Sequence, residues 1–424
     1  MPGSELPLVT ALPFVALLLV IAIAPLVVPS WWHHNRNKAL VSLAISIPIL
    51  MYLGTTAPEL LQEKFHEYLR FIVVIAALFV IAGGIHIQGS LAGTPLVNTG
   101  VLGLGAVLAN LLGTTGASVL LIRPLLRANK RRKRVAHIVI FFIFIVANCG
   151  GLLTPIGDPP LLLGYLKGVP FDWTLRLWPQ WLTLNGILLV VFNFWDQWAL
   201  DKDEKELPGS QHEEVLIHEP LRIQGGVETL VLLGIIISIV LAASSLVIVL
   251  LALIGYFAGS GDRRAKNGFT FGPIIEVAVL FAAIFATMAP VLEMLNAWAQ
   301  RPDFELTKPA HFFWASGALS SVLDNAPTYL AFAASAAGLQ GVAPHGAYIG
   351  TIALNPEAAK LLAAISTGAV FMGANTYIGN APNFMVKAIA EENGVKMPSF
   401  FGYLGYSGGI LLPLFVLVSL VFFR

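Results

Sequence analysis

One short motif occurs twice in the chain, and it decides the fold. The first copy is Thr-Pro-Ile-Gly-Asp-Pro-Pro at residues 154–160, and the second is Thr-Tyr-Ile-Gly-Asn-Ala-Pro at residues 376–382. Each copy follows a stretch without Asp, Glu, Lys or Arg, and each threonine is preceded by a glycine three residues earlier, Gly151 or Gly373. Glycine loosens a helix, and proline removes a donor and clashes with the preceding turn. The motif therefore predicts two broken helices, which we place at 135–166 and 361–393.

The composition around these motifs is that of a membrane protein. Hydrophobic residues make up 57% of the 424 residues and charged residues only 12%, whereas a soluble domain carries about 25% charged residues. A spanning helix needs roughly 20 mostly apolar residues. We therefore expect an all-α, multi-pass integral membrane protein whose main partner is the lipid bilayer, most simply the bacterial cytoplasmic membrane. Its about ten transmembrane helices are predicted at 6–28, 39–56, 68–88, 135–154, 175–199, 227–241, 243–259, 271–294, 361–376 and 402–423.

Two further apolar segments, 97–126 and 310–338, have polar centres. Each could be one helix or two half-helices that meet at a turn, and backbone that leaves the helix inside lipid must line protein or water. The dense basic run at 127–134 should be cytoplasmic, as should the basic residues at 36–38. Only a re-entrant hairpin at 97–126 satisfies both expectations, so we favour hairpins for both segments. The same count places the N-terminus outside.

The order of elements is the same in the two halves of the chain, but their orientation is opposite. We expect a first inverted repeat at 1–200, a cytoplasmic linker at 201–226 and a second inverted repeat at 227–424. Broken helices in inverted repeats form the binding sites of many secondary transporters, because the freed carbonyl and N–H groups attract ions.

Two acids, Asp158 and Asp324, lie in otherwise apolar sequence. A carboxylate inside a membrane costs at least a few kcal/mol, so it indicates function by default. In the alignment of the halves, Asp158 stands opposite Asn380, and Asp324 opposite Thr114. A desolvated carboxylate favours a proton and a nearby Na⁺ favours the charged form, so the two ions can compete for one group. The alternative interpretation of Asp158 is a helix N-cap.

Small polar residues gather around both breaks and both hairpin centres. Hydroxyl and amide oxygens, with backbone carbonyls, suit hard cations, although helix–helix hydrogen bonding is an equally simple role for any one of them. The candidate ion- or substrate-binding residues are Asp158, Asp324, Asn325, Thr328, Thr154, Gly157, Asn375, Thr376, Gly379, Asn380, Thr114, Thr115, Ser118 and Asn148.

Several function classes find no support in the sequence. The net charge is only +1, so there is no argument for a nucleic-acid partner. No phosphate-binding loop is present, which disfavours an ATP-driven pump. No catalytic or metal-ligand spacing indicates an enzyme, and the single cysteine, Cys149, rules out a cysteine-rich metal site. We expect no cofactor, only Na⁺ and H⁺ as transported or coupling ions.

These motifs resemble the ion transporter superfamily, specifically its sodium/proton antiporter and citrate-transporter-like branch. The resemblance rests on the stretches 148–171, 321–328 and 373–383 and covers about residues 10–424. It implies inverted repeats with re-entrant hairpins, a homodimer and an elevator-type motion. Relatives exchange Na⁺ for H⁺ or carry citrate, dicarboxylates or arsenite. Dicarboxylate carriers have Ser-Asn-Thr motifs in both hairpins, whereas this chain has Gly-Thr-Thr-Gly-Ala-Ser at 113–118 and the pair Asp324-Asn325.

An extra acid at the centre repels a carboxylate and suits a cation. The leading hypothesis is therefore a Na⁺(Li⁺)/H⁺ antiporter, with the Na⁺ held by Asp158, Asp324, Asn325, Thr154, Thr376 and Asn380. The alternative is Na⁺- or H⁺-coupled transport of a di- or tricarboxylate such as citrate. In either case the substrate is a small ion or a small anion.

Overall fold

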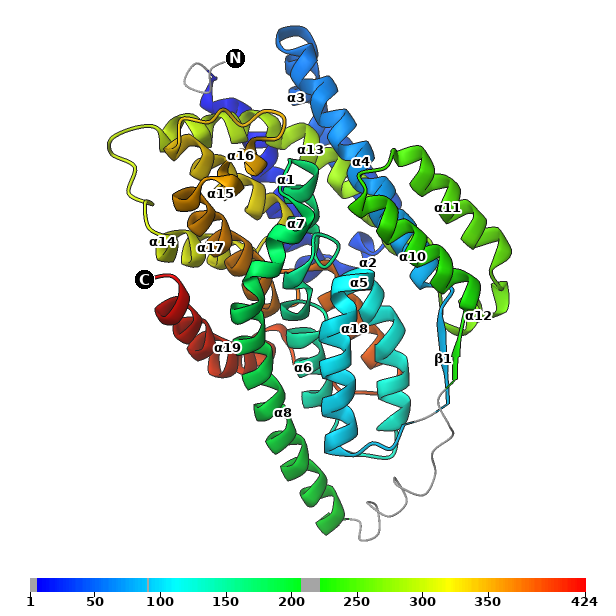
Figure 1. Cartoon of the computed structure of the whole chain (residues 1–424). Helices are drawn as coiled ribbons and strands as arrows, with labels where there is room; N and C mark the ends of the chain where they lie inside the picture. The colour runs from blue at the N-terminus through cyan, green and yellow to red at the C-terminus, as the bar shows by residue number, and fades with distance from the viewer. Residues whose placement is uncertain (1–5, 90, 207–221) are drawn as a thin grey trace.

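The described part of the chain is helical almost throughout (Figure 1). The computed structural model describes residues 6–89, 91–206 and 222–424. Within these ranges, nine helices are long and apolar enough to cross a membrane. This confirms the prediction of an all-α membrane protein.

Most helices of the first half overlap the predicted segments, but the helix predicted at 68–88 spans 58–82. The helices of this half are the 3₁₀ helix η2 (Leu8–Ala11), α1 (Leu12–Val27), α2 (Pro29–Trp32), α3 (Asn35–Thr56), α4 (Pro58–Ala82), α5 (Pro95–Ala128), α6 (Ala136–Ile145), the 3₁₀ helix η3 (Cys149–Leu153), α7 (Pro159–Leu166), the 3₁₀ helix η4 (Phe171–Leu177) and α8 (Trp178–Glu206).

The second half contains a corresponding set. Its helices are α10 (Gly226–Val240), α11 (Ser245–Ala258), α12 (Gly261–Lys266), α13 (Gly272–Ala299), α14 (Pro309–Ser320), α15 (Asn325–Leu339), α16 (Tyr348–Leu354), α17 (Pro356–Met372), the 3₁₀ helix η5 (Gly373–Asn375), α18 (Ala381–Glu392) and α19 (Phe400–Phe422).

Helix α5 is folded back on itself at Gly113. This residue has φ +73° and ψ 158°, a conformation that glycine adopts without the penalty of a side chain. At the opposite end of the segment, Asn98 and Asn129 exchange two amide hydrogen bonds of 3.0 and 2.9 Å. The two arms therefore run antiparallel and return to the same level, as Figure 1 shows in cyan. This is the geometry expected for a hairpin at 97–126.

The corresponding segment of the second half is divided more completely. Helix α14 ends at Ser320 and α15 begins at Asn325. The two helices pack against each other and against α17. Asp324 accepts a hydrogen bond of 3.1 Å from the backbone N–H of Ala326 and so caps α15. The break falls on the polar centre that the sequence indicates.

Both predicted broken helices are interrupted at the motif. In the first, Thr154 has φ −134° and ψ 156°, and in the second, Thr376 has φ −136° and ψ 167°. Two glycines come close in each break, because a Cβ on Gly157 would lie 2.1 Å from the Gly151 carbonyl oxygen, and one on Gly379 would lie 2.5 Å from that of Gly373. The repeated glycines thus hold the same backbone path in both halves.

Three features differ from the predicted segments. Helix α4 ends at Ala82, and the residues after it form a strand, β1 (His86–Gln88), which pairs antiparallel with β2 (Arg222–Gln224). Helix α16 is not anticipated by the sequence. Helix α8 continues through 201–206, because its acidic end is held by the basic run: Arg134 donates to Asp203 at 2.6 Å. The rest of the predicted linker up to residue 221, and the N-terminal residues 1–5, lie outside the described residues.

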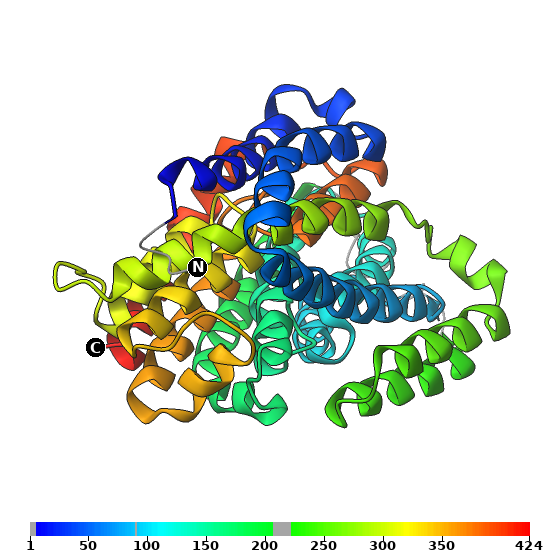
Figure 2. The same cartoon turned by 90° about the horizontal axis from the view of Figure 1, so that it is seen from above.

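The helices α3, α4, α10, α11 and α13 pack around one another, and we call them the frame helices. Seen from above, α10 and α11 lie at the edge of the molecule (Figure 2). We call the segments that contain the two breaks and the two hairpins, α5 to α7 and α14 to α18, the core segments. They meet the frame mainly where α4 contacts α5 and α7 and where α13 contacts α15.

Candidate functional site

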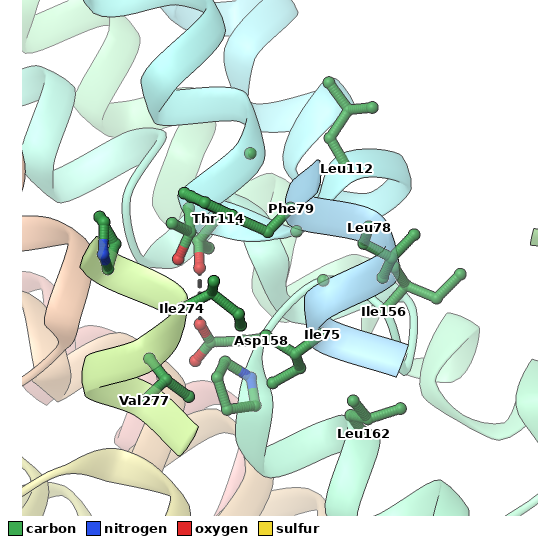
Figure 3. Close-up of a pocket in the computed structure, with 16 residues that line it drawn as sticks. Ile75, Leu78, Phe79, Leu112, Thr114, Ile156, Asp158, Leu162, Ile274 and Val277 are labelled. Carbon is green, nitrogen blue, oxygen red and sulfur yellow. Dashed lines mark hydrogen bonds between the residues drawn. The ribbon is translucent and has the colours of Figure 1, made fainter. Parts of the chain in front are cut away.

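Asp158 is the centre of a buried hydrogen-bond cluster. One carboxylate oxygen, Oδ1, accepts from the Thr114 hydroxyl at 2.9 Å and from the Asn380 amide at 3.2 Å. The other, Oδ2, accepts from the Asn325 amide at 2.5 Å. Figure 3 shows the carboxylate pointing toward Thr114. All four side chains are 2% exposed or less, so the carboxylate is removed from bulk water and held by neutral donors.

The donors come from both halves of the chain. Thr114 follows the bend of the first hairpin, Asn325 begins α15 in the second hairpin, and Asn380 lies in the second break. Asp158 reaches them because it is the extended residue before α7, with φ −146° and ψ 146°. The Thr114 N–H also donates to the Gly157 carbonyl at 2.9 Å, which fixes the hairpin bend against the first break.

A second layer of amides orients the first. Asn380 shares its two N–H groups among Asp158, the Asn148 side-chain oxygen and the Ala147 carbonyl, each 3.2 Å from its amide nitrogen. Asn148 donates to the Asn383 side-chain oxygen at 2.7 Å, and Asn383 donates to the carbonyls of Gly373 and Thr376 at 2.9 Å each. The oxygen and both N–H groups of Asn148 and of Asn383 all have partners, which fixes the orientation of these two side chains.

Asp324 precedes Asn325 and lies beside this cluster, but the hydrogen bonds described for Asp324 do not include one to Asp158. Its carboxylate caps α15, it is half-buried, and its carbonyl accepts from the Thr328 hydroxyl at 3.0 Å. The alternative role predicted for Asp158 is a helix N-cap. Asp158 makes no side-chain cap to α7, whereas Asp324 does make such a cap, to α15.

The motif threonines tie the breaks to the hairpins. Thr154 donates to the Asn110 carbonyl at 2.5 Å, and Thr376 donates to the Ser321 carbonyl at 2.6 Å. Asn375 donates to the Ser321 hydroxyl at 2.8 Å. The structure therefore places these three predicted residues outside the hydrogen bonds of the Asp158 carboxylate, with Thr154 and Thr376 in equivalent positions in the two breaks.

A cavity of about 70 Å³ adjoins the carboxylate (Figure 3). This volume holds a few water molecules. Frame helices α4 and α13 form one wall, and the first hairpin and the first break form the other. Its polar lining residues are Asp158, Thr114 and Thr115, and its apolar ones include Ile75, Leu78, Phe79, Ile156, Ile274 and Val277.

Two buried oxygen atoms near the hairpin bends make no hydrogen bond within the described part of the chain. They are Oδ1 of Asn325 and the hydroxyl oxygen of Ser118. Carboxylate, amide and hydroxyl oxygens are the ligands that hard cations prefer. Among the described residues there is no group of three or more His, Cys, Asp or Glu side chains that could hold a metal ion.

The sequence interpretation missed several polar residues that build the site. The Asn110 amide donates to the Gly150 carbonyl at 2.7 Å, and its oxygen accepts from the Leu153 N–H at 2.8 Å. An asparagine three residues before the glycine bend, in an apolar segment, was the available indication. Ser321 is not among the predicted residues either, because its partner Asn375 lies in the second break, 54 residues later in the chain.

Comparison with known protein families agrees with these features. A family model described as "Putative citrate transport" matches residues 3–423, nearly the whole chain. No curated protein matches the chain. The family match confirms the resemblance to citrate-transporter-like members of the ion transporter superfamily.

Proposed function

The chain belongs to this transporter family, and from that premise we propose that it is a secondary active transporter that exchanges Na⁺ or Li⁺ for H⁺ at Asp158. The observation that carries the proposal is the bonding of this carboxylate. Its three partners, Thr114, Asn325 and Asn380, are neutral. Because no Lys or Arg is among the hydrogen bonds described for it, its charge is left for a mobile cation.

Competition for one carboxylate explains exchange rather than cotransport. A proton on Asp158 removes the charge that would hold Na⁺, and a bound Na⁺ favours the ionised carboxylate over the protonated one. The Thr114 hydroxyl can donate or accept, and each asparagine carries an oxygen as well as an amide group. Rotation of these groups would therefore let the same side chains serve both forms. Asp324 supplies a second negative charge nearby.

The alternation would be of the elevator type. Both hairpins and both breaks converge on one carboxylate, so the core segments can carry it as a unit, while the frame helices provide a stationary surface. We propose that the protein works as a homodimer in the bacterial cytoplasmic membrane, with the basic run 127–134 inside. The inverted repeats at 1–200 and 227–424 belong to this proposal.

The family description favours a second candidate, Na⁺- or H⁺-coupled transport of citrate or a related carboxylate. In that case the N-termini of α7 and α18, which both start at the breaks, would face the substrate carboxylates. Asp158 and Asp324 would repel a free polycarboxylate, which is why we rank this candidate second.

Everted membrane vesicles with an acid interior separate the two candidates. An acridine dye reports the pH gradient while Na⁺, Li⁺, K⁺ and citrate are added in turn. Recovery of fluorescence with Na⁺ or Li⁺ alone is the expected result. The opposite result would be no change in fluorescence with any cation, and a fluorescence response or radiolabel uptake only when citrate is added. That result would refute the antiporter and support the carboxylate carrier. Vesicles without the protein are the control.

A further inference from the structure

A cluster of charged residues joins the frame helices to the core segments, far from Asp158. Glu67 on α4 accepts from Lys167, the residue after α7, at 2.6 Å, and from Lys64 at 3.1 Å. The side chains of both lysines are 2% exposed and that of Glu67 is 16% exposed. A single carboxylate thus holds two buried ammonium groups, one from the frame and one from the core.

A second contact crosses the same boundary next to the first. Glu63 on α4 accepts from the backbone N–H of Gly346 at 3.0 Å. His345 lies 3.3 Å from Glu293 on α13 and 3.8 Å from Glu63. Residues 345 and 346 belong to the loop between α15 and α16.

The two core partners of the cluster form one unit. The Lys167 carbonyl accepts from the Gly350 N–H on α16 at 2.9 Å. Gly168 packs so closely on Ala347 that a Cβ there would lie 2.6 Å from the Cβ of Ala347. The end of the first broken helix and the end of the second hairpin therefore meet the frame together.

The cluster and the cavity lie toward opposite ends of the same two frame helices. On α4, the cluster residue Glu67 precedes the first cavity residue, Ile75, by a helical rise of about 12 Å. On α13, the cavity residue Val277 and the cluster residue Glu293 are separated by about 24 Å. In the predicted topology the cavity lies toward the inner side and the cluster toward the outer side.

We propose that Lys64, Glu67 and Lys167, with Glu63, Glu293 and His345 beside them, form a latch between core and frame that keeps the outer side closed while the Asp158 cavity faces inward. This inference rests on the proposed transport function. Lys167 is its movable member, because it follows the helix that Asp158 begins. The contacts of Lys167 and of residues 345–346 must break before the core can slide along α4 and α13 and open to the outside.

A labelling experiment tests the latch without transport. A cysteine at Thr115, which is half-buried and lines the cavity, reports access to a membrane-impermeant maleimide in right-side-out and everted vesicles. Lys130→Cys, exposed in the basic run, marks the inner face. The native Cys149 is fully buried, so the parent protein serves as the blank.

With the latch intact, we expect fast labelling of Thr115→Cys from the inner face and slow labelling from the outer face. Lys167→Gln should raise the outer rate roughly tenfold by shifting the population toward the outward-open state. Glu67 keeps Lys64 as a partner in this variant. The charge exchange Glu67→Lys with Lys167→Glu should return the outer rate toward that of the parent.

Lys360→Gln is the matched control, because Lys360 pairs with Glu357 at 3.0 Å within a single core helix and both side chains are exposed. An unchanged outer rate in folded Lys167→Gln, or an equal rise in Lys360→Gln, overturns the latch. Rapid outer labelling of the parent overturns it too. If Lys167→Gln does not fold, Glu63→Gln takes its place with the same expected direction, because Glu63 is less buried and contacts Gly346 across the same boundary.

The labelling result and the exchange result fail separately. A rise in the outer rate without Na⁺/H⁺ exchange leaves the latch standing and removes the antiporter. Normal Na⁺/H⁺ exchange with an unchanged outer labelling rate supports the antiporter and overturns the latch.

Discussion

The two breaks share a backbone but differ in charge. Asp158 and Asn380 occupy the same extended position before a proline-containing helix, with φ/ψ of −146°/146° and −153°/141°. One side chain is a carboxylate that only accepts hydrogen bonds when ionised, and the other is an amide that donates to it. The comparison shows that a repeated backbone can place two unlike groups face to face, so that the first break provides a charge and the second break a neutral donor to it.

Their surroundings fix which half takes which role. The three side chains that contact Asp158 donate to it. Asn380, by contrast, also faces two acceptor oxygens, the Ala147 carbonyl and the side-chain oxygen of Asn148. A carboxylate at 380 would meet oxygen atoms on two further sides, so the two positions are not interchangeable.

The largest expected effect comes from removing the charge at the first break. Asp158→Asn should lower exchange by roughly a hundredfold or more, because losing charge-assisted bonds to a cation costs about 3 kcal/mol. Asp324→Asn should lower it less, since asparagine still caps α15. The dye assay in everted vesicles measures both. Exchange by Asp158→Asn at the parent rate would remove Asp158 from the mechanism.

Moving the charge to the second break sharpens the comparison. The double variant Asp158→Asn with Asn380→Asp should remain inactive. It should also be less stable than Asp158→Asn by about 1–3 kcal/mol, because a buried carboxylate at 380 would face the Ala147 carbonyl and the Asn148 side-chain oxygen. Exchange and thermal unfolding in detergent give the two readouts. Recovery of exchange in the double variant would show that the two positions are equivalent after all.

The smallest effect is expected from the shared backbone itself. Gly157→Ala would place a Cβ 2.1 Å from the Gly151 carbonyl oxygen, and such overpacking costs about 1–3 kcal/mol. Gly379→Ala, at 2.5 Å from the Gly373 carbonyl oxygen, should lower the melting temperature somewhat less. Gly186→Ala is the control, because it lies in α8 with no atom within 4 Å of the added Cβ. An unchanged melting temperature in Gly157→Ala would refute the close glycine contact.

The sequence predicts best where one local rule decides the outcome. Runs of apolar residues place the spanning helices, and the Gly–Pro motif places both breaks. The polar centres of the hairpins follow from composition, and Asp158, Asn325, Asn380 and Thr114 are among the residues predicted for the site. Their joint contact depends on the packing of both halves, which no local pattern encodes.

Charged contacts between distant segments cannot be predicted from the sequence, because they also depend on how the halves pack. Lys167 stands only nine residues after Asp158, but its partner Glu67 lies 100 residues earlier. Arg132 belongs to the basic run 127–134 that sets the topology, yet it is buried and contacts Asp196 of α8 at 2.5 Å. Charge counting assigns such a residue to a loop, because the pairing that makes its burial possible exists only in the folded protein.

The proposed exchange at Asp158 also has an electrical consequence. If this carboxylate alone is loaded, it returns with one proton for each Na⁺, and the cycle moves no net charge and ignores the membrane potential. If Asp324 is loaded as well, two protons can return for one Na⁺. Each cycle then moves one charge, worth about 2.3 kcal/mol per 100 mV. In the proposed exchanger, the number of carboxylates that carry an ion, Asp158 alone or Asp158 with Asp324, thus decides whether the membrane potential can drive exchange.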